Sequence, residues 1–283
     1  MTIVRSEKSL PNLIYVGTGK AGSTWLHYVL GKHPEVYLTS VKETNFFDLN
    51  FDKGVKWYMS FFCDAKEEKL IGEVAHRYFR NEHVAYRMKR TLVDPKIIIG
   101  LRDPRSYFMS DYLYAKKNGM FVGDTAEYAR ERFSWDVLEY KKHLSKFLLH
   151  FPKDNIFVYD FNLLKTSPKE LYTELCLFLD ISCDFWADDF AQPVNKAASA
   201  RFPLVARLLK LGSISLKRLG GQKFIAAVKR NSILKRVVYR ELLDQPVLDA
   251  TVEQRLLDVS RRNVEWLDQI FSLGLLRSWG YEK

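Results

Sequence analysis

A glycine-rich turn near the N-terminus combines the residue types that bind phosphate. Residues 17–25 read GTGKAGSTW and follow the apolar run NLIYV at residues 12–16. The three glycines would let the backbone amides approach an anion closely, and a helix that begins near Ser23 would add the positive end of its dipole. The sequence therefore predicts an anion-binding turn between a strand and a helix.

The lysine of this turn does not stand where nucleotide hydrolases keep theirs. Their signature is G-x-x-x-x-G-K-[ST], and here Ser23 occupies the lysine position while Lys20 comes three residues earlier. The apolar run at 96–101, KIIIGL, leads to Arg102, and Asp103 after it suits a helix cap better than a magnesium site. Both departures favour a nucleotide whose transferred group needs no metal. A sulfuryl group fits, because it carries less negative charge than a terminal phosphoryl group.

Arg102 and Ser110 form a second candidate phosphate site. Arg102 ends the predicted strand at 96–101, and Ser110 lies about two turns into the helix that we expect from Pro104 onward. Arginine offers a planar fork to phosphate oxygens, and a serine hydroxyl adds one donor. Both side chains can point toward the carboxyl edge of a sheet, near the first turn.

Strand-like and helix-like runs alternate through the first half of the chain. Strand patterns occur at 12–16, 35–38, 70–75, 96–101 and 156–159. Helix patterns occur at 23–30, 54–62, 81–92, from 104 and at 168–179. Such alternation predicts an α/β fold of three layers, with a central parallel sheet between helices, like that of P-loop nucleotide-binding proteins. Ligands bind beyond the carboxyl ends of such strands, so we expect the loops 17–23, 102–110 and 159–165 to matter.

Length and composition favour one large domain over two small ones. We expect a single domain over 1–283, with an α/β core at 11–190 and a mostly helical part at 191–283. The three cysteines are too few and too scattered for a disulfide framework or a zinc site. No segment reaches the roughly 18 apolar residues that span a bilayer, and the N-terminus is too polar for a signal peptide. These features favour a soluble, cytoplasmic protein.

The net charge of +10 arises from one segment. Residues 201–240 hold eleven Lys and Arg and no Asp or Glu, which leaves 33 basic and 34 acidic residues elsewhere. The segment favours an anionic partner, either an anionic substrate or a membrane surface, although a helical hairpin with a solvated basic face would have the same composition. Nucleic acid is not expected, because no DNA- or RNA-binding motif is present and aromatic residues do not interleave with the basic ones.

These motifs resemble the sulfotransferases that use 3′-phosphoadenosine 5′-phosphosulfate (PAPS). GTGKAGSTWLHYVLGKHPEV is similar to the family's lysine-bearing loop, helix and following HP turn, and IIIGLRDPRSYFMSDY keeps an arginine and a serine eight residues apart. VKETNFFD and KWYMSFF resemble the branch that sulfates heparan-type glycans, and YDFNLL and LLRSWGY also resemble family members. The likeness covers most of residues 11–190 and a short C-terminal stretch.

The resemblance implies a role for each residue of the two phosphate sites. The 5′-phosphosulfate would be held by Lys20, Ala21, Gly22, Ser23, Thr24 and Trp25. Lys20 would balance the charge on the bridging oxygen as its bond to sulfur breaks. Arg102 and Ser110 would hold the 3′-phosphate, which distinguishes this donor from ATP. No metal would be required, and 3′-phosphoadenosine 5′-phosphate (PAP) would be the product.

Glu43 in VKETNFFD matches the glutamate that serves as general base in the glycan branch. His76 could serve instead, as histidine does in the branch that acts on small molecules. Val74 follows Glu73 where the family often has a lysine. Lys42 could assist at the sulfuryl group or bind an acidic acceptor, although a lysine beside a glutamate is usually solvated.

The resemblance also implies a loop that closes over the 3′-phosphate. VNKAASAR at 194–201 could supply it, with Lys196 and Arg201 as donor-binding residues. We therefore expect an enzyme that moves a sulfuryl group from PAPS to a hydroxyl or amine, with a carbohydrate or glycolipid acceptor favoured. A lipid or polyketide alcohol is the alternative acceptor. A P-loop kinase and a non-catalytic anion-binding module are the alternatives from other classes.

Overall fold

The computed structural model describes residues 10–192, 198–200, 239–241 and 246–280. The strands are β1 (Leu13–Gly17), β2 (Val36–Leu38), β3 (Leu70–Val74), β4 (Lys96–Leu101), β5 (Ile156–Asp160), β6 (Ala198–Ala200) and β7 (Tyr239–Glu241). The helices of the first half are α1 (Ser23–Leu30), α2 (Phe46–Leu49), α3 (Gly54–Met59), α4 (Val84–Thr91), α5 (Pro104–Lys117) and α6 (Thr125–Glu131). The later helices are α7 (Tyr140–His150), α8 (Phe161–Thr166), α9 (Pro168–Leu179), α13 (Ala250–Phe271) and α14 (Leu275–Ser278).

The chain divides into two compact units. The first comprises Met1–Asp103, Trp135–Val194 and Val259–Lys283, and the second comprises Pro104–Ser134 and Asn195–Asp258. The expected organisation, one domain over 1–283 with a core at 11–190, stays a prediction. After residue 191 the described residues include α13 and α14, as a helical part requires, and also the antiparallel pair β6–β7. Each of these strands has three residues, too few to show a strand pattern in the sequence.

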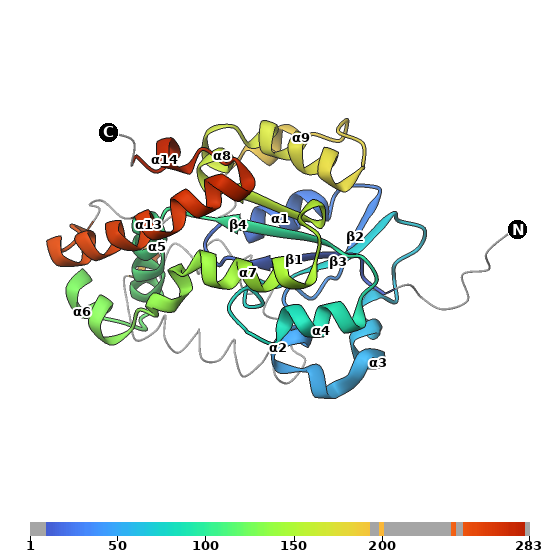
Figure 1. Cartoon of the computed structure of the whole chain (residues 1–283), viewed down its shortest axis with the longest axis horizontal. Coiled ribbons are helices and arrows are strands. Elements are labelled where there is room, and N and C mark those ends of the chain that lie inside the picture. The colour runs from blue at the N-terminus through green and yellow to red at the C-terminus, as the bar shows by residue number, and fades with distance from the viewer. Residues whose placement is uncertain (1–9, 193–197, 201–238, 242–245, 281–283) are drawn as a thin grey trace, which may run out of the picture. The chain divides into compact units, whose positions relative to one another are not determined.

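The first unit is built on a five-stranded parallel sheet, as predicted. Its strand order is β2-β3-β1-β4-β5, and every neighbouring pair is parallel (Figure 1). The chain passes from β1 through β2 to β3 on one side, and then adds β4 and β5 on the other side. The order therefore reverses at β1, and ligands of such sheets bind beyond the carboxyl end of the strand at this point. The glycine-rich turn directly follows β1.

Helices cover both faces of this sheet, which confirms the predicted three layers. Every residue of β1 and of β3 is buried, as expected of strands with a helix on each face. On one face, side chains of α1 and α9 such as Leu26 and Leu175 pack against Leu13, Tyr15 and Ile98 of the sheet. Figure 1 shows α4 and α7 on the opposite face.

Two of the three expected ligand loops are not loops along their whole length. The helix α5 begins at Pro104, so most of 102–110 is helical. The strand β5 continues to Asp160, whose carboxylate caps α8 by accepting from the Asn162 amide at 3.0 Å. Both corrections have a local cause, because proline suits the first helical turn and aspartate suits the cap.

The second unit contains α5 and α6, the pair β6–β7 and the start of α13. A capping box starts α6: the Asp124 carboxylate accepts from the Glu127 amide at 2.9 Å, and the Glu127 carboxylate accepts from the Asp124 amide at 3.2 Å. Phe108 and Tyr128 pack edge to face, with ring centroids 5.7 Å apart. Short polar caps and aromatic contacts thus fix this part of the chain.

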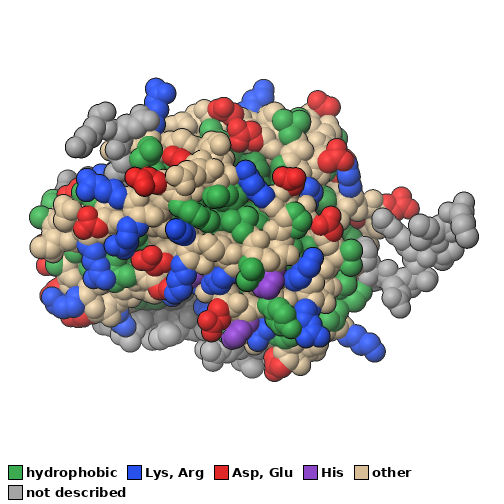
Figure 2. Space-filling model, in the orientation of Figure 1, with side chains coloured by type: hydrophobic (Ala, Val, Ile, Leu, Met, Phe, Trp, Pro, Cys, Tyr) green, Lys and Arg blue, Asp and Glu red, His purple; other side chains and the backbone are tan. Residues whose placement is uncertain are grey.

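The described surface carries charges of both signs. Figure 2 shows Lys and Arg side chains interspersed with Asp and Glu on the face that it draws. Of the basic segment 201–240, only Tyr239 and Arg240 lie within the described residues, in β7, so the basic surface stays a prediction. Within the described ranges, no helix is long and apolar enough to span a membrane. The three cysteines are free thiols.

Candidate functional site

The turn after β1 points its backbone carbonyls toward side chains of the sheet. Three of them accept hydrogen bonds: Thr18 O from Tyr15 at 2.7 Å, Lys20 O from Arg102 at 2.8 Å, and Ala21 O from Tyr159 at 2.6 Å. Because the N–H of a trans peptide points opposite to its C=O, the amides of Gly19, Ala21 and Gly22 point away from these donors. These amides therefore point to the side of the turn opposite the three donors, where we expect an anion to bind.

The backbone of the turn has the shape of an anion-binding nest. Lys20 and Gly22 have left-handed conformations, with φ of 62° and 92°, and left-handed residues in alternation make successive amides converge. No side chain caps α1 at Gly22, so the amides of its first turn can also face a ligand. Gly22 cannot be replaced easily, since its φ of 92° is a conformation that other residues adopt only with strain. The local structure fits the predicted phosphosulfate site.

Lys42 connects this turn to the loop that carries Glu43. The Lys42 ammonium donates to Thr24 Oγ1 at 3.1 Å and lies 3.3 Å from Ser23 Oγ. His27 lies on α1, the helix of Ser23 and Thr24. Burial lowers the pKa of His27 most, and the positive charge of Lys42 also lowers it. Two hydroxyls that the resemblance assigns to the donor therefore contact Lys42, a cation other than Lys20.

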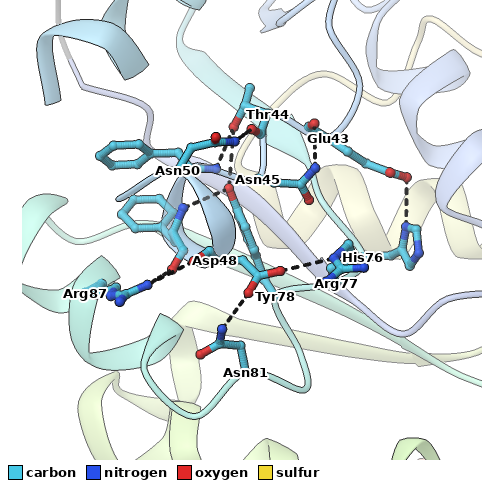
Figure 3. A network of polar contacts seen from close by, with 12 residues as sticks. Glu43, Thr44, Asn45, Asp48, Asn50, His76, Arg77, Tyr78, Asn81 and Arg87 are labelled. Atoms are coloured by element: carbon cyan, nitrogen blue, oxygen red, sulfur yellow. Dashed lines mark hydrogen bonds and ion pairs between the residues drawn. The ribbon is translucent and has the colours of Figure 1, made fainter. Parts of the chain in front are cut away.

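Glu43 and His76 lie in contact, as Figure 3 shows. His76 Nδ1 is 2.8 Å from Glu43 Oε1, and the two side chains are 37% and 26% exposed. At this distance the imidazole donates its Nδ1 proton to the carboxylate, which leaves Nε2 as the acceptor nitrogen in neutral histidine. The two residues that the sequence offered as alternative bases therefore form one pair.

Comparison with known proteins identifies the family. Residues 10–200 match the model of the sulfotransferase domain. The chain belongs to the sulfotransferase domain family.

Two curated relatives and one solved structure illustrate the similarity. This sulfotransferase domain is 38% identical over 109 residues to the membrane-associated sulfotransferase kil1 of Dictyostelium discoideum, a match covering 38% of this chain and 23% of that protein. It is 31% identical over 201 residues to the bifunctional heparan sulfate N-deacetylase/N-sulfotransferase 1 of Caenorhabditis briggsae, covering 62% and 23%. The match therefore spans less than a quarter of either relative. A sulfotransferase from Alicyclobacillus acidocaldarius shares the fold, with a TM-score of 0.59 and 22% identity over 81% of this chain and 99% of that one.

The remaining predicted donor residues fall in different places. The Trp25 indole is 5% exposed and donates to Phe190 O at 2.8 Å, within the core below the turn. The Arg102 guanidinium lies 4.5 Å from the centre of the Phe161 ring, in addition to its bond to the turn. Ser110 lies on α5 in the second unit, whereas Arg102 belongs to the first, so their joint 3′-phosphate site stays a prediction. Lys196 and Arg201 lie outside the described residues.

A polar cluster is centred on Asp48, five residues after Glu43. The Asp48 carboxylate of α2 accepts from Arg77 Nε at 3.1 Å and from Asn81 Nδ2 at 2.5 Å (Figure 3). Arg87 donates to the backbone carbonyls of Phe47 and Asp48 at 2.8 and 3.1 Å. The Arg77 side chain is 53% exposed and directly follows His76. Both Asp48 oxygens are paired and its side chain is 8% exposed, so Arg77, rather than Asp48, has surface open to a ligand.

Two features of the site had only weak signals in the sequence: the contacts of Lys42 and the buried partners of Glu73. Lys42 had one signal, its place directly before Glu43. Glu73 had another, since it is a carboxylate within an apolar strand run, LIGEVA, and such a residue needs buried partners. In the part of the chain that the structure describes, no group of three His, Cys, Asp or Glu side chains is placed to hold a metal ion.

Proposed function

We propose that this chain transfers a sulfuryl group from PAPS to a hydroxyl or amine of a carbohydrate acceptor. Membership of the sulfotransferase domain family supports the reaction class. The observation that carries the proposal is the contact of Lys42 with Ser23 and Thr24, because it joins the Glu43 loop to the donor turn. A base next to a donor site is what sulfuryl transfer to a hydroxyl requires.

The donor turn fits a phosphosulfate. Its outward amides and the first turn of α1 would bind the 5′-phosphosulfate oxygens, and Lys20 and Lys42 would balance their charge. Arg102 fixes the turn through Lys20 O and would contribute to the 3′-phosphate site. These cations and amides would carry out what a metal ion does in phosphoryl transfer.

The acceptor would attack sulfur in line with the bridging oxygen of the donor. Its oxygen forms the new bond to sulfur, while the bond from sulfur to the bridging oxygen breaks and its electron pair stays on the 5′-phosphate of PAP. Glu43 takes the proton of the acceptor hydroxyl, and His76 holds the Glu43 carboxylate through Nδ1–H. Lys20 stabilises the charge that develops on the bridging oxygen.

The choice of a glycan acceptor rests on likeness. The relative from Caenorhabditis briggsae is named for heparan sulfate, and the exposed Arg77 directly after His76 would suit a polar or anionic acceptor. A lipid or polyketide alcohol is a less favoured acceptor. A cytoplasmic location and contact of the basic segment with an anionic surface also remain proposals.

Ligand binding and transfer can be tested together. PAP at 100 times its Kd should stabilise the chain by about 2.7 kcal/mol, which is several degrees of Tm, whereas ATP with magnesium should shift it much less. Lys20→Ala should reduce sulfur-35 transfer from labelled PAPS far more than it weakens PAP binding, and Lys89→Ala, an exposed lysine of α4, should change neither. Equal shifts with the two nucleotides would contradict the donor, and loss of activity with a chelator would favour a kinase.

The acceptor can be identified with the same labelled donor. Heparan-type oligosaccharides, glycolipids, long-chain alcohols and phenols are offered separately, and a sulfated glycan is the expected product. Transfer only to the alcohols or phenols would contradict the carbohydrate assignment while leaving the donor assignment intact.

A further inference from the structure

Glu73 is a buried carboxylate that the reaction described above does not use. It lies in β3 and has no exposed surface. Four donors reach it: Thr44 Oγ1 at 2.6 Å and the Thr44 amide at 3.3 Å on Oε2, and the hydroxyls of Tyr58 at 2.7 Å and Tyr78 at 2.8 Å on Oε1. Each carboxylate oxygen therefore accepts two hydrogen bonds.

This arrangement is costly for a residue that only fills space. Moving a carboxylate from water into a protein interior costs several kcal/mol, and a hydrophobic residue of similar volume avoids that cost. Burial raises the pKa of Glu73, and the four hydrogen bonds oppose that increase. Burial and the neighbouring Glu73 charge raise the pKa values of Tyr58 and Tyr78, so both hydroxyls stay protonated as donors. The carboxylate thus serves as an acceptor for a fixed set of groups.

The group that Glu73 holds most directly is the residue after Glu43. Thr44 bonds to Glu73 through both its amide and its hydroxyl. Its two neighbours, Glu43 and Asn45, have left-handed conformations with φ of 68° and 52°. Asparagine adopts this conformation readily, whereas glutamate does so at a cost in free energy that its surroundings must offset. The Glu43 amide also donates to Val74 O at 3.2 Å.

One short segment therefore fixes Glu43 from three directions. Glu73 holds Thr44, the carbonyl of Val74 accepts from the Glu43 amide, and His76 contacts the Glu43 carboxylate. Figure 3 shows Thr44, Glu43 and His76 within one polar network. Loss of the anchor at Thr44 would release the backbone on one side of Glu43.

We infer that Glu73 is a positioning residue for sulfuryl transfer, acting through Thr44 to hold the Glu43 carboxylate in place. This inference rests on the proposed function, because it takes Glu43 as the base. A displacement of about 1 Å can reduce a rate about 100-fold, so the anchor controls the rate without touching donor or acceptor.

Thr44→Val tests this inference, with Thr44→Ser as the matched control. Valine keeps the shape of threonine but removes the 2.6 Å bond to Glu73, whereas serine keeps the hydroxyl. Thr44→Val should lower kcat about 10- to 100-fold, with the KM for PAPS and the Tm shift from PAP unchanged. Thr44→Ser should stay within about threefold of the wild type. Leu175→Ala, a core change on α9, reports what loss of stability alone does to kcat.

A second comparison separates positioning from a general structural effect. If Thr44 acts through Glu43, then Thr44→Val should have almost no further effect on kcat in a Glu43→Gln background. Three results for Thr44→Val would overturn this inference but not the proposed function. They are an equal loss of kcat in both backgrounds, a kcat equal to that of Thr44→Ser, and a loss of kcat no larger than that of Leu175→Ala. A wild type without sulfuryl transfer, or a Glu43→Gln variant with the wild-type rate, would overturn the proposed function and this inference with it.

Discussion

Changing Glu43 and His76, singly and together, should distinguish the base from its partner. The variants are Glu43→Gln, His76→Ala and the double variant. His76 Nδ1 lies 2.8 Å from Glu43 Oε1. If one residue orients the other, the effects of the two single variants should not add in the double variant. His83→Ala is the control, because the His83 side chain is 64% exposed and its ion pair within the described residues is with the exposed Glu82.

The expected magnitudes follow from the roles and the exposure. A general base contributes about 10²- to 10⁴-fold, equivalent to roughly 3–5 kcal/mol of activation free energy, so Glu43→Gln should lose that much. The contact with His76 is partly exposed, with 37% and 26% of the two side chains accessible. Such a pair contributes about 0.2–1 kcal/mol. His76→Ala should therefore lower kcat about fivefold or less, and the double variant should resemble Glu43→Gln.

The measurement is the initial rate of sulfur-35 transfer at saturating PAPS, together with the Tm shift from PAP to confirm that the donor still binds. The assignment of Glu43 as base is refuted if His76→Ala loses at least about 100-fold while Glu43→Gln loses less than about tenfold. In that case His76 Nε2 would take the proton, and Glu43 would orient the imidazole. Losses that multiply in the double variant would show that the two residues act independently.

Three further predictions concern the donor turn and the buried carboxylate. Steady-state kinetics should show that Lys42→Met lowers kcat about 100-fold and that Lys42→Arg lowers it less. An unchanged kcat for Lys42→Met would contradict a role of this lysine in the donor site. Gly22→Ala and Gly54→Ala should each cost backbone strain of about 1–3 kcal/mol, because both glycines have a positive φ. Only Gly22→Ala should reduce the Tm shift from PAP, and an unchanged shift in this variant would contradict a role of the turn in binding. Burial raises the pKa of Glu73 above 4.5, so between 4.5 and that higher value the native chain keeps a proton that the unfolded chain has lost, and stability falls as pH rises. Denaturant titrations would measure the free energy of unfolding of the wild type minus that of Glu73→Gln. This difference should decrease as pH rises from 4.5, and an increase would contradict a raised pKa of Glu73.

Elements with strong local signals could be predicted from the sequence. The observed α1, β4 and α9 have the bounds expected from the patterns at 23–30, 96–101 and 168–179. Each has a marker at its start: the glycine turn before Ser23, the uniform apolar run KIIIGL, and Pro168 in the first helical turn. The expected helix at 54–62 ends earlier, because α3 stops at Met59 and a 3₁₀ turn follows. Helix ends depend on contacts that periodicity does not report.

The partners within the site could not be predicted in the same way. Glu43 and His76 are 33 residues apart, and Thr44 and Glu73 are 29 apart. Local patterns carry no information on such pairs, so the sequence could only offer Glu43 and His76 as alternatives. The pairing becomes visible once β2 is placed beside β3, because the residues that follow β2 then lie next to the end of β3 and the residues after it.

The register of β1 and β3 explains why the glycine-rich turn lies near the segment after β3 that carries His76. Tyr15 pairs with Val74, so both strands end at the same edge of the sheet. Beyond that point the chains stay joined, since the Ala75 amide donates to Tyr15 O at 2.9 Å and the Phe79 amide donates to Val16 O at 2.7 Å. A slip of one residue would turn each side chain of β3 to the other face of the sheet. The proposed in-line transfer would depend on close alignment of the reacting groups, since a displacement of about 1 Å can reduce a rate about 100-fold. The hydrogen bonds of the buried sheet would contribute to that alignment.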